Sequence, residues 1–248
     1  MRLSEFHAKI DIDTSIVEQL ALRTANLQLL TIRDMNRTSE QVREALVLMT
    51  VKIFRGENEL ATPLTNLWLS RLGSAEEGDQ LLNALSDSKM TTVRYLNFGD
   101  NKSWWSNPNA IGILANFIKK QEHLEELKLH KNNLTGAMLT KLLFTLRTSK
   151  SIQSLKKVQL DECMWDTDEA CEELAQILAE APRLESVRIF NQKGSRKIDI
   201  ELQSAPRPTS GRQSFSRNRG FVRIFDFITG VNICLVNTWR SEEINIGK

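Results

Sequence analysis

A spaced pattern of leucines that recurs about every thirty residues constrains the fold of this chain more than any other feature. The clearest copy runs from Leu124 to Leu134 and reads Leu-Glu-Glu-Leu-Lys-Leu-His-Lys-Asn-Asn-Leu. It matches the repeat L-x-x-L-x-L-x-x-N-x-L at every constrained position. The other copies begin, in chain order, at Leu27, Leu64, Val93, Leu155 and Leu184. Six copies in one register predict a chain built from stacked units.

The segments between these copies have apolar residues at helical spacing. Four leucines between residues 139 and 146 fall on one face of a helix. Ser74 precedes Glu77 by three residues, which is the spacing of a capping box at a helix start. Each unit is therefore expected to contain a strand, a turn and a helix.

Over residues 27–192, about two thirds of the chain, these motifs resemble the ribonuclease-inhibitor-like leucine-rich-repeat proteins. The resemblance implies an α/β fold, a leucine-rich-repeat solenoid with a curved parallel sheet inside and helices outside. It also implies that Asn101, Asn132 and Cys163 occupy the turn position whose side chain bonds to neighbouring backbone. Cys163 is accordingly expected to be buried and structural rather than a reactive thiol.

The chain divides into four segments by pattern and composition. Residues 1–26 are expected to cap the first repeat, and residues 27–202 to form the solenoid, with residues 196–202 alternating like an edge strand. Residues 203–220 are rich in Ser, Arg, Pro and Gly, which predicts a flexible linker. Residues 221–248 contain a strongly apolar stretch that predicts a hairpin or docking segment. The last two segments form a non-repeat C-terminal extension, and the pattern leaves open what it contacts.

Side chains alternate along a strand, so residues between the buried leucines are expected to line the concave face of the sheet. Aromatic side chains beside charges of both signs are typical of protein interfaces. At least one of two consecutive tryptophans in the loop after the third copy is expected to be partly exposed, because both cannot easily face inward. The candidate partner-binding residues are Trp68, Tyr95, Asn97, Trp104, Trp105, Glu126, Lys128, His130, Lys157, Asp161, Arg188 and Phe190.

A plainer interpretation of the same positions stays open. They can be solvated sheet residues without a partner, with Trp68 packed beneath the insertion at residues 55–63.

The sequence offers no constellation that predicts catalysis or metal binding. It lacks a phosphate-cradling glycine loop, a Ser/His/Asp or Cys/His arrangement and a plausible pair of carboxylates. Its three histidines and three cysteines do not have metal-ligand spacing. We therefore expect a non-catalytic protein that needs no cofactor and binds another protein.

Two alternative functions remain. The linker contains four arginines and no acidic residue, which is compatible with binding RNA or an acidic partner. The repeats also look like those of the Ran GTPase-activating proteins, which would make this chain a GTPase regulator. Those proteins typically have an acidic tail, whereas this C-terminal section is basic. The net charge of +2 favours neither nucleic acid nor a membrane surface.

Location is predicted from what the sequence lacks. Charges run throughout Met1–Asp13, so a secretory signal is not expected, and no apolar run is long enough for a transmembrane segment. An intracellular protein, cytoplasmic or nuclear, is the resulting expectation. The pattern does not indicate an oligomeric state.

Overall fold

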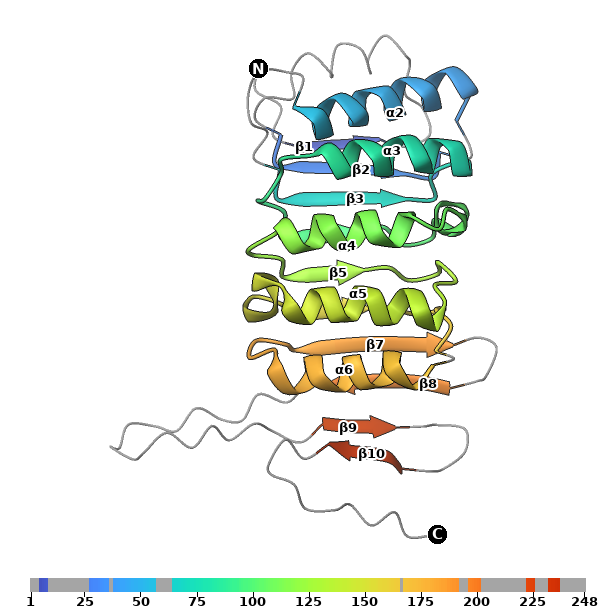
Figure 1. Cartoon of the computed structure of the whole chain (residues 1–248). Helices are drawn as coiled ribbons and strands as arrows, with labels where there is room; N and C mark the ends of the chain where they lie inside the picture. The colour runs from blue at the N-terminus through green and yellow to red at the C-terminus, as the bar shows by residue number, and fades with distance from the viewer. Residues whose placement is uncertain are drawn as a thin grey trace, which may run out of the picture.

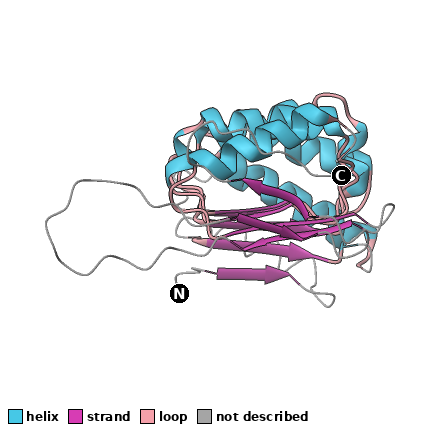
Figure 2. Ribbon diagram, turned by 90° about the horizontal axis from the view of Figure 1, so that it is seen from below, coloured by secondary structure: helices cyan, strands magenta, loops and turns pink. Residues whose placement is uncertain are grey.

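The computed structural model of the chain describes residues 5–8, 27–35, 38–56, 64–165, 167–191, 196–201, 222–225 and 232–236. The linker predicted over residues 203–220 and most of the cap predicted over residues 1–26 lie outside these ranges. Within them, a layer of helices lies against one face of a β-sheet (Figures 1 and 2). The predicted α/β class is confirmed.

The strands of the main sheet are paired in the order in which they occur in the chain. They are β1 (Glu5–Ala8), β2 (Leu29–Arg33), β3 (Asn66–Ser70), β4 (Tyr95–Asn97), β5 (Glu126–Lys128), β6 (Lys157–Gln159), β7 (Ser186–Asn191) and β8 (Arg196–Glu201). Pairing is parallel from β1 to β7, and β8 joins β7 in the antiparallel direction. A second sheet consists of the antiparallel strands β9 (Val222–Phe225) and β10 (Asn232–Val236).

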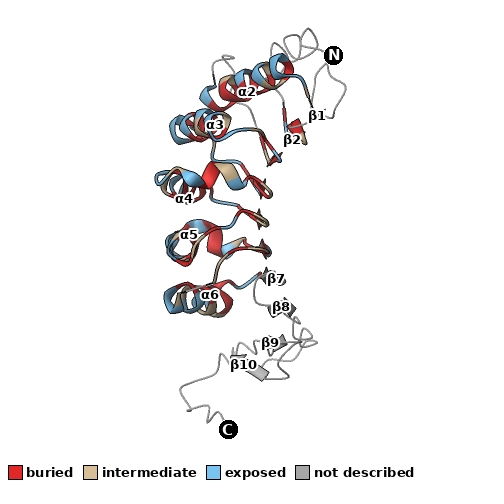
Figure 3. Cartoon of the chain, turned by 90° about the vertical axis from the view of Figure 1, so that its right-hand side faces the viewer, coloured by how far each residue is buried: buried red, intermediate tan, exposed pale blue. Residues whose placement is uncertain are grey.

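A helix follows each strand from β2 to β6, as a parallel connection requires. These helices are α2 (Glu40–Arg55), α3 (Ala75–Asp87), α4 (Ala110–Lys120), α5 (Gly136–Thr148) and α6 (Asp168–Glu180). Two short 3-10 helices, η3 (Lys102–Ser106) and η4 (Lys150–Gln153), lie in the connections. The helices are stacked side by side in chain order along one face of the sheet (Figures 1 and 3).

The leucine pattern sets the register of the sheet. Leu67, Leu96, Leu127 and Val158 occupy the same position in successive copies, and each is paired with the next across the parallel strands. All four side chains are at most 1% exposed. Because one repeat position meets itself in the neighbouring unit, the apolar side chains form one continuous core between the sheet and the helices.

Asparagines in the turns after the strands bond to the backbone of adjacent units, as predicted. Asn101 accepts a hydrogen bond from the Leu72 amide at 2.9 Å and donates to the carbonyls of Leu69 at 2.8 Å and Phe98 at 3.1 Å. Asn132 repeats part of this pattern, since it accepts from the Asn101 amide at 2.7 Å and donates to the Phe98 carbonyl at 2.9 Å. These amides satisfy backbone groups that are buried between units.

Cys163 occupies the same position in the next copy. Its sulfur lies 3.7 Å from the Leu129 carbonyl oxygen, and the residue is 1% exposed. Burial raises the pKa of the Cys163 thiol to about 12. The predicted burial is confirmed, and the thiol is protonated at neutral pH, which is the unreactive form.

The expectation that Trp104 or Trp105 is partly exposed is wrong. Both are buried, at 1% and 5% exposure. They lie in η3, where successive side chains point about 120° apart, so two neighbours can flank the inward direction. Trp104 meets Phe98 edge to face with ring centroids 5.7 Å apart, and it covers Gly78 in α3 so closely that a Cβ there would lie 2.3 Å from the indole. Glycine at position 78 therefore makes room for the indole.

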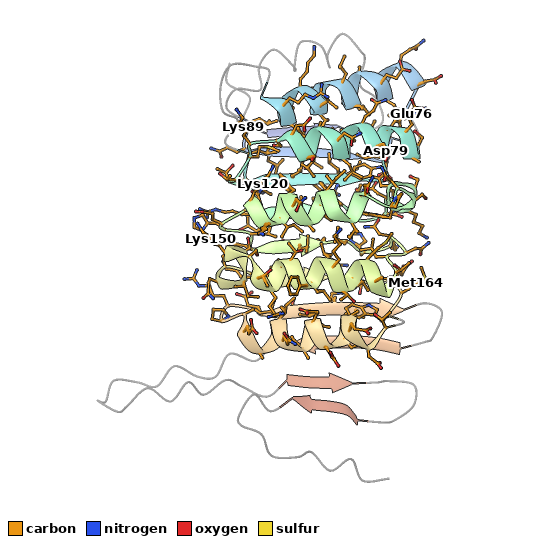
Figure 4. All side chains as sticks on the ribbon, in the orientation of Figure 1. Glu76, Asp79, Lys89, Lys120, Lys150 and Met164 are labelled. Carbon is orange, nitrogen blue, oxygen red and sulfur yellow. The ribbon has the colours of Figure 1, made fainter. Side chains whose placement is uncertain are left out.

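Two of the side chains labelled in Figure 4, Glu76 and Lys120, lie at helix ends that suit the sign of their charge. Glu76 lies in the first turn of α3, and Lys120 is the last residue of α4. Lys120 donates to the Ser86 and Ser88 carbonyls near the end of the preceding helix, at 3.0 and 3.1 Å. This arrangement complements the helix dipoles. The capping box predicted at the start of α3 is present, with Ser74 as the N-cap.

No helix in the described ranges combines the length and the apolar content that crossing a membrane requires.

Candidate functional site

The face of the main sheet opposite the helices is not covered by any helix of the described residues (Figures 2 and 3). We call it the open face. Because the strands are in register, equivalent side chains form rows across it. The middle row contains Thr31, Trp68, Asn97, Lys128, Gln159 and Arg188. The row beside it contains Leu29, Asn66, Tyr95, Glu126, Lys157 and Ser186.

Trp68 lies in β3 within the middle row and is only partly buried. The Arg33 guanidinium, from β2, stacks on the indole with its carbon 3.0 Å from the ring centroid. The Lys128 ammonium approaches the same ring at 5.9 Å. The Trp68 indole nitrogen has no hydrogen-bond partner. Residues 57–63 lie outside the described ranges, so packing of Trp68 beneath that insertion stays untested.

Trp68 separates two hollows in the open face, each with a volume of about 180 Å³. The first, which we call the aromatic hollow, is lined by parts of Leu29, Thr31, Asn66, Leu67, Trp68, Tyr95, Leu96, Asn97, Glu126 and Lys128. The second, which we call the polar cup, lies at the carboxyl ends of the strands. Its walls are Arg33, Asp34, Trp68, Ser70, Arg71, Asp100, His130 and Lys131.

The rim of the polar cup belongs to a row of alternating charges. One residue in each of five copies adopts the left-handed conformation just after its strand, namely Asp34, Arg71, Asp100, Lys131 and Glu162, with φ between 55° and 63°. Arg71 pairs with Asp34 at 2.8 Å and with Asp100 at 2.7 Å, and Lys131 lies 3.9 Å from Glu162. The hydrogen bonds to both aspartates raise the pKa of Arg71. We call this row the charge ladder.

Sequence reasoning missed the charge ladder, although its signal was present. When the copies are aligned, the residue seven positions after each start alternates in sign from the first copy to the fifth. This position lies in a turn, so strand alternation alone does not point to it.

Replacing Arg71 with methionine is expected to lower the free energy of unfolding by about 1 kcal/mol at low salt, because two carboxylates lose their shared partner. The loss is expected to shrink at high salt, where exposed charges are screened. Denaturant unfolding of both proteins at two salt concentrations measures it. An effect that does not depend on salt would show that Arg71 contributes through packing and not through charge.

The remaining candidate residues fall into distinct environments. Lys128 pairs with Glu126 at 2.8 Å, and Tyr95 is 40% exposed beside them. Lys157 is exposed on β6. Asn97 is buried, and its side-chain oxygen accepts a hydrogen bond from the Gly99 amide at 2.9 Å, so it serves the turn after β4. The side chain of Phe190 lies outside the described part of the chain.

The Asp161 carboxylate lies on the open face near β6 and β7. Asp161 is 6% exposed, and one of its oxygens accepts from Gln159 at 2.6 Å and faces the Arg188 guanidinium at 3.4 Å. Its other oxygen is buried without a partner. A buried carboxylate oxygen in this condition has hydrogen-bonding capacity to spare.

His130 follows β5 and is half-buried. Burial lowers the pKa of His130, and this effect outweighs the nearby carboxylates of Asp161 and Asp100. The imidazole is therefore uncharged at neutral pH. Its Nδ1 has no hydrogen-bond partner.

The structure thus brings Trp68, Tyr95, Glu126, Lys128 and His130 together, and it removes Trp104 and Trp105 from the surface. No group of three or more His, Cys, Asp or Glu side chains in the described ranges could hold a metal ion. In comparisons with known proteins, neither a family model nor a curated protein matches this chain.

Proposed function

We propose that this chain is a leucine-rich-repeat solenoid that binds another protein through the open face of its sheet and does not catalyse a reaction. The observation that carries the proposal is the pair Trp68 and Tyr95 on adjacent strands of a face that no helix of the described residues covers. Large aromatic side chains flanked by charges supply much of the binding energy in protein interfaces.

The repeat assignment is supported by three features that have one cause. The leucine positions pair with themselves across the strands, the turn asparagines bond to neighbouring backbone, and the turn residues share a left-handed conformation. Each is expected when one structural unit is stacked on copies of itself.

Substituting Trp68 or Tyr95 with alanine is expected to weaken capture of the native protein partner by about tenfold or more, because hot-spot truncations typically cost about 2 kcal/mol. Affinity capture with the whole chain from its source cells, quantified by mass spectrometry, provides the measurement. Phe144→Ala is the matched control, since Phe144 is 51% exposed on α5, on the opposite side of the sheet.

The Phe144 variant is expected to retain the captured protein. Thermal unfolding of each variant shows whether it is folded. Folded Trp68 and Tyr95 variants that retain the partner at the wild-type level would remove the open face as the binding site.

The alternatives predict different behaviour in the same experiment. Binding through the arginine-rich residues 203–220 would survive both aromatic substitutions and fall steeply with salt. Stimulated GTP hydrolysis by a captured GTPase would instead support the regulator hypothesis.

A further inference from the structure

The polar cup lies between two large side chains, Arg33 and His130, with the small Ser70 between them. Four neighbouring units have Arg33, Ser70, Gly99 and His130 at the same position of the repeat. At Gly99 a Cβ atom would lie 2.2 Å from the His130 imidazole, so the ring lies directly over this glycine. Because the ring covers Gly99, Ser70 is the small residue that lines the cup between the Arg33 and His130 side chains.

The carboxylates of the cup already form ion pairs within the chain. Arg71 holds both Asp34 and Asp100 in ion pairs of 2.8 and 2.7 Å. Two hydrogen-bond donors in the cup wall, by contrast, have no acceptor: the Arg33 Nε and the Trp68 indole nitrogen are both buried and unpartnered. The His130 Nδ1 is unpartnered as well. Buried donors without acceptors are costly in isolation, so a ligand that supplies an acceptor is favoured here.

We infer that the polar cup binds the carboxylate of an aspartate or glutamate side chain from the partner protein, while an apolar side chain of the same segment fills the aromatic hollow. This inference rests on the proposed function and specifies the chemistry of the partner. Arginine binds a carboxylate through two parallel hydrogen bonds. Trp68 forms the wall that the cup shares with the aromatic hollow.

The charge around the cup selects a carboxylate over a phosphate. The cup walls carry three cationic side chains, Arg33, Arg71 and Lys131, and two carboxylates, Asp34 and Asp100, so one positive charge is left over and matches a singly charged group. A group with nearly two negative charges would meet these carboxylates more unfavourably than a singly charged one.

The shared wall explains why two side chains of one segment are needed. Trp68 lines both hollows, with Tyr95 in the first and the charged side chains of the cup in the second. The first hollow follows the middle of the strands and the second follows their carboxyl ends. An extended segment lying along the strands presents side chains on one face about 7 Å apart at alternate positions, which lets it reach both.

Titration of the isotopically labelled full chain with two blocked tripeptides tests the inference. The probes are N-acetyl-Leu-Ser-Glu-amide and its Gln counterpart, which differ only in the carboxylate. The readout is the Trp68 indole N–H signal in nitrogen–proton correlation spectra, assigned by its absence in Trp68→Phe. The Glu peptide is expected to move this signal saturably, with an affinity about tenfold above that of the Gln peptide.

Two arginine variants test whether the peptide carboxylate binds in the cup. Arg33→Met keeps an unbranched stem over Trp68 but removes the donors, and it is expected to weaken the Glu peptide by about tenfold. Arg147→Met removes an arginine that lies over the Phe144 ring on α5, on the helix side of the sheet, and binding is expected to change less than about twofold. The signals of Trp104 and Trp105, both buried in the core, are expected to stay in place in every titration.

Equal responses to the two peptides, no response of Trp68 to the Glu peptide, or full binding by folded Arg33→Met would each overturn the inference. None of these results changes the outcome expected in the partner-capture experiment. If capture still depends on Trp68 and Tyr95, the open face binds a protein that does not use a carboxylate here. If capture does not depend on them, the proposed function fails with or without peptide binding.

Discussion

Leu127→Ala is expected to lower the free energy of unfolding by about 2–5 kcal/mol, the range for large-to-small changes in packed cores. Leu127 is fully buried in the central strand β5 and is paired with Leu96 on one side and Val158 on the other. Truncation leaves a cavity that borders three repeat units at once. Neighbouring side chains that are locked in register have little freedom to fill it.

Denaturant unfolding followed by circular dichroism measures this loss. Leu48→Ala provides the matched control. It deletes the same side-chain atoms, but at a position on α2 where the side chain is 55% exposed to water. Its expected effect is within about 0.5 kcal/mol. An unfolding midpoint that Leu127→Ala leaves unchanged would contradict the stacked core.

Asn101→Ala is expected to cost about 3 kcal/mol, because one side chain satisfies three backbone groups from two adjacent units. The substitution leaves the buried Leu72 amide without its acceptor and removes a donor from the carbonyls of Leu69 and Phe98. The Phe98 carbonyl retains its bond from Asn132, so the loss is smaller than three complete bonds. Buried groups left unpaired cost about 1–3 kcal/mol each.

Asn101→Asp separates the two roles of the amide, since it keeps an acceptor for Leu72 and loses the donors. It is expected to be destabilised as well, because a carboxylate would then face two carbonyl oxygens. Asn83→Ala on the exposed face of α3 is the control, and it is expected to be neutral or slightly stabilising since alanine favours helices. A wild-type unfolding curve for Asn101→Ala would mean that water can replace the amide at this turn.

The repeat pattern predicted the strands and their order with good accuracy. Each copy from Leu27 onward contains a strand at the expected place, and Leu67, Leu96 and Leu127 lie in register as the alignment of copies requires. The prediction succeeded because the period is set by burial of the same position in every unit. Such a signal adds up over many copies and survives irregular residues in any one of them.

The candidate site was predicted less completely. The rows of the open face follow from strand alternation, and Trp68 and Tyr95 lie where this rule places them. The exposure of Trp104 and Trp105 in the following loop was predicted wrongly. Strand alternation does not apply there, because these residues lie in a 3-10 helix that packs against Gly78 and Phe98. The charge ladder is visible in the aligned copies, but it lies in turns, to which neither strand nor helix periodicity applies.

By itself, the sequence determined the succession of strand and helix, the residues of the shared core and the face on which polar side chains gather. These depend on spacing along the chain, because apolar side chains must recur at the period of the structure that buries them. Only the tertiary structure decided how the polar side chains of that face use their hydrogen bonds. Arg33 stacks on Trp68, Arg71 joins two aspartates and His130 lies over Gly99, and in each case the groups come from different repeat units. Such contacts depend on distances and directions in space, which no period along the chain encodes.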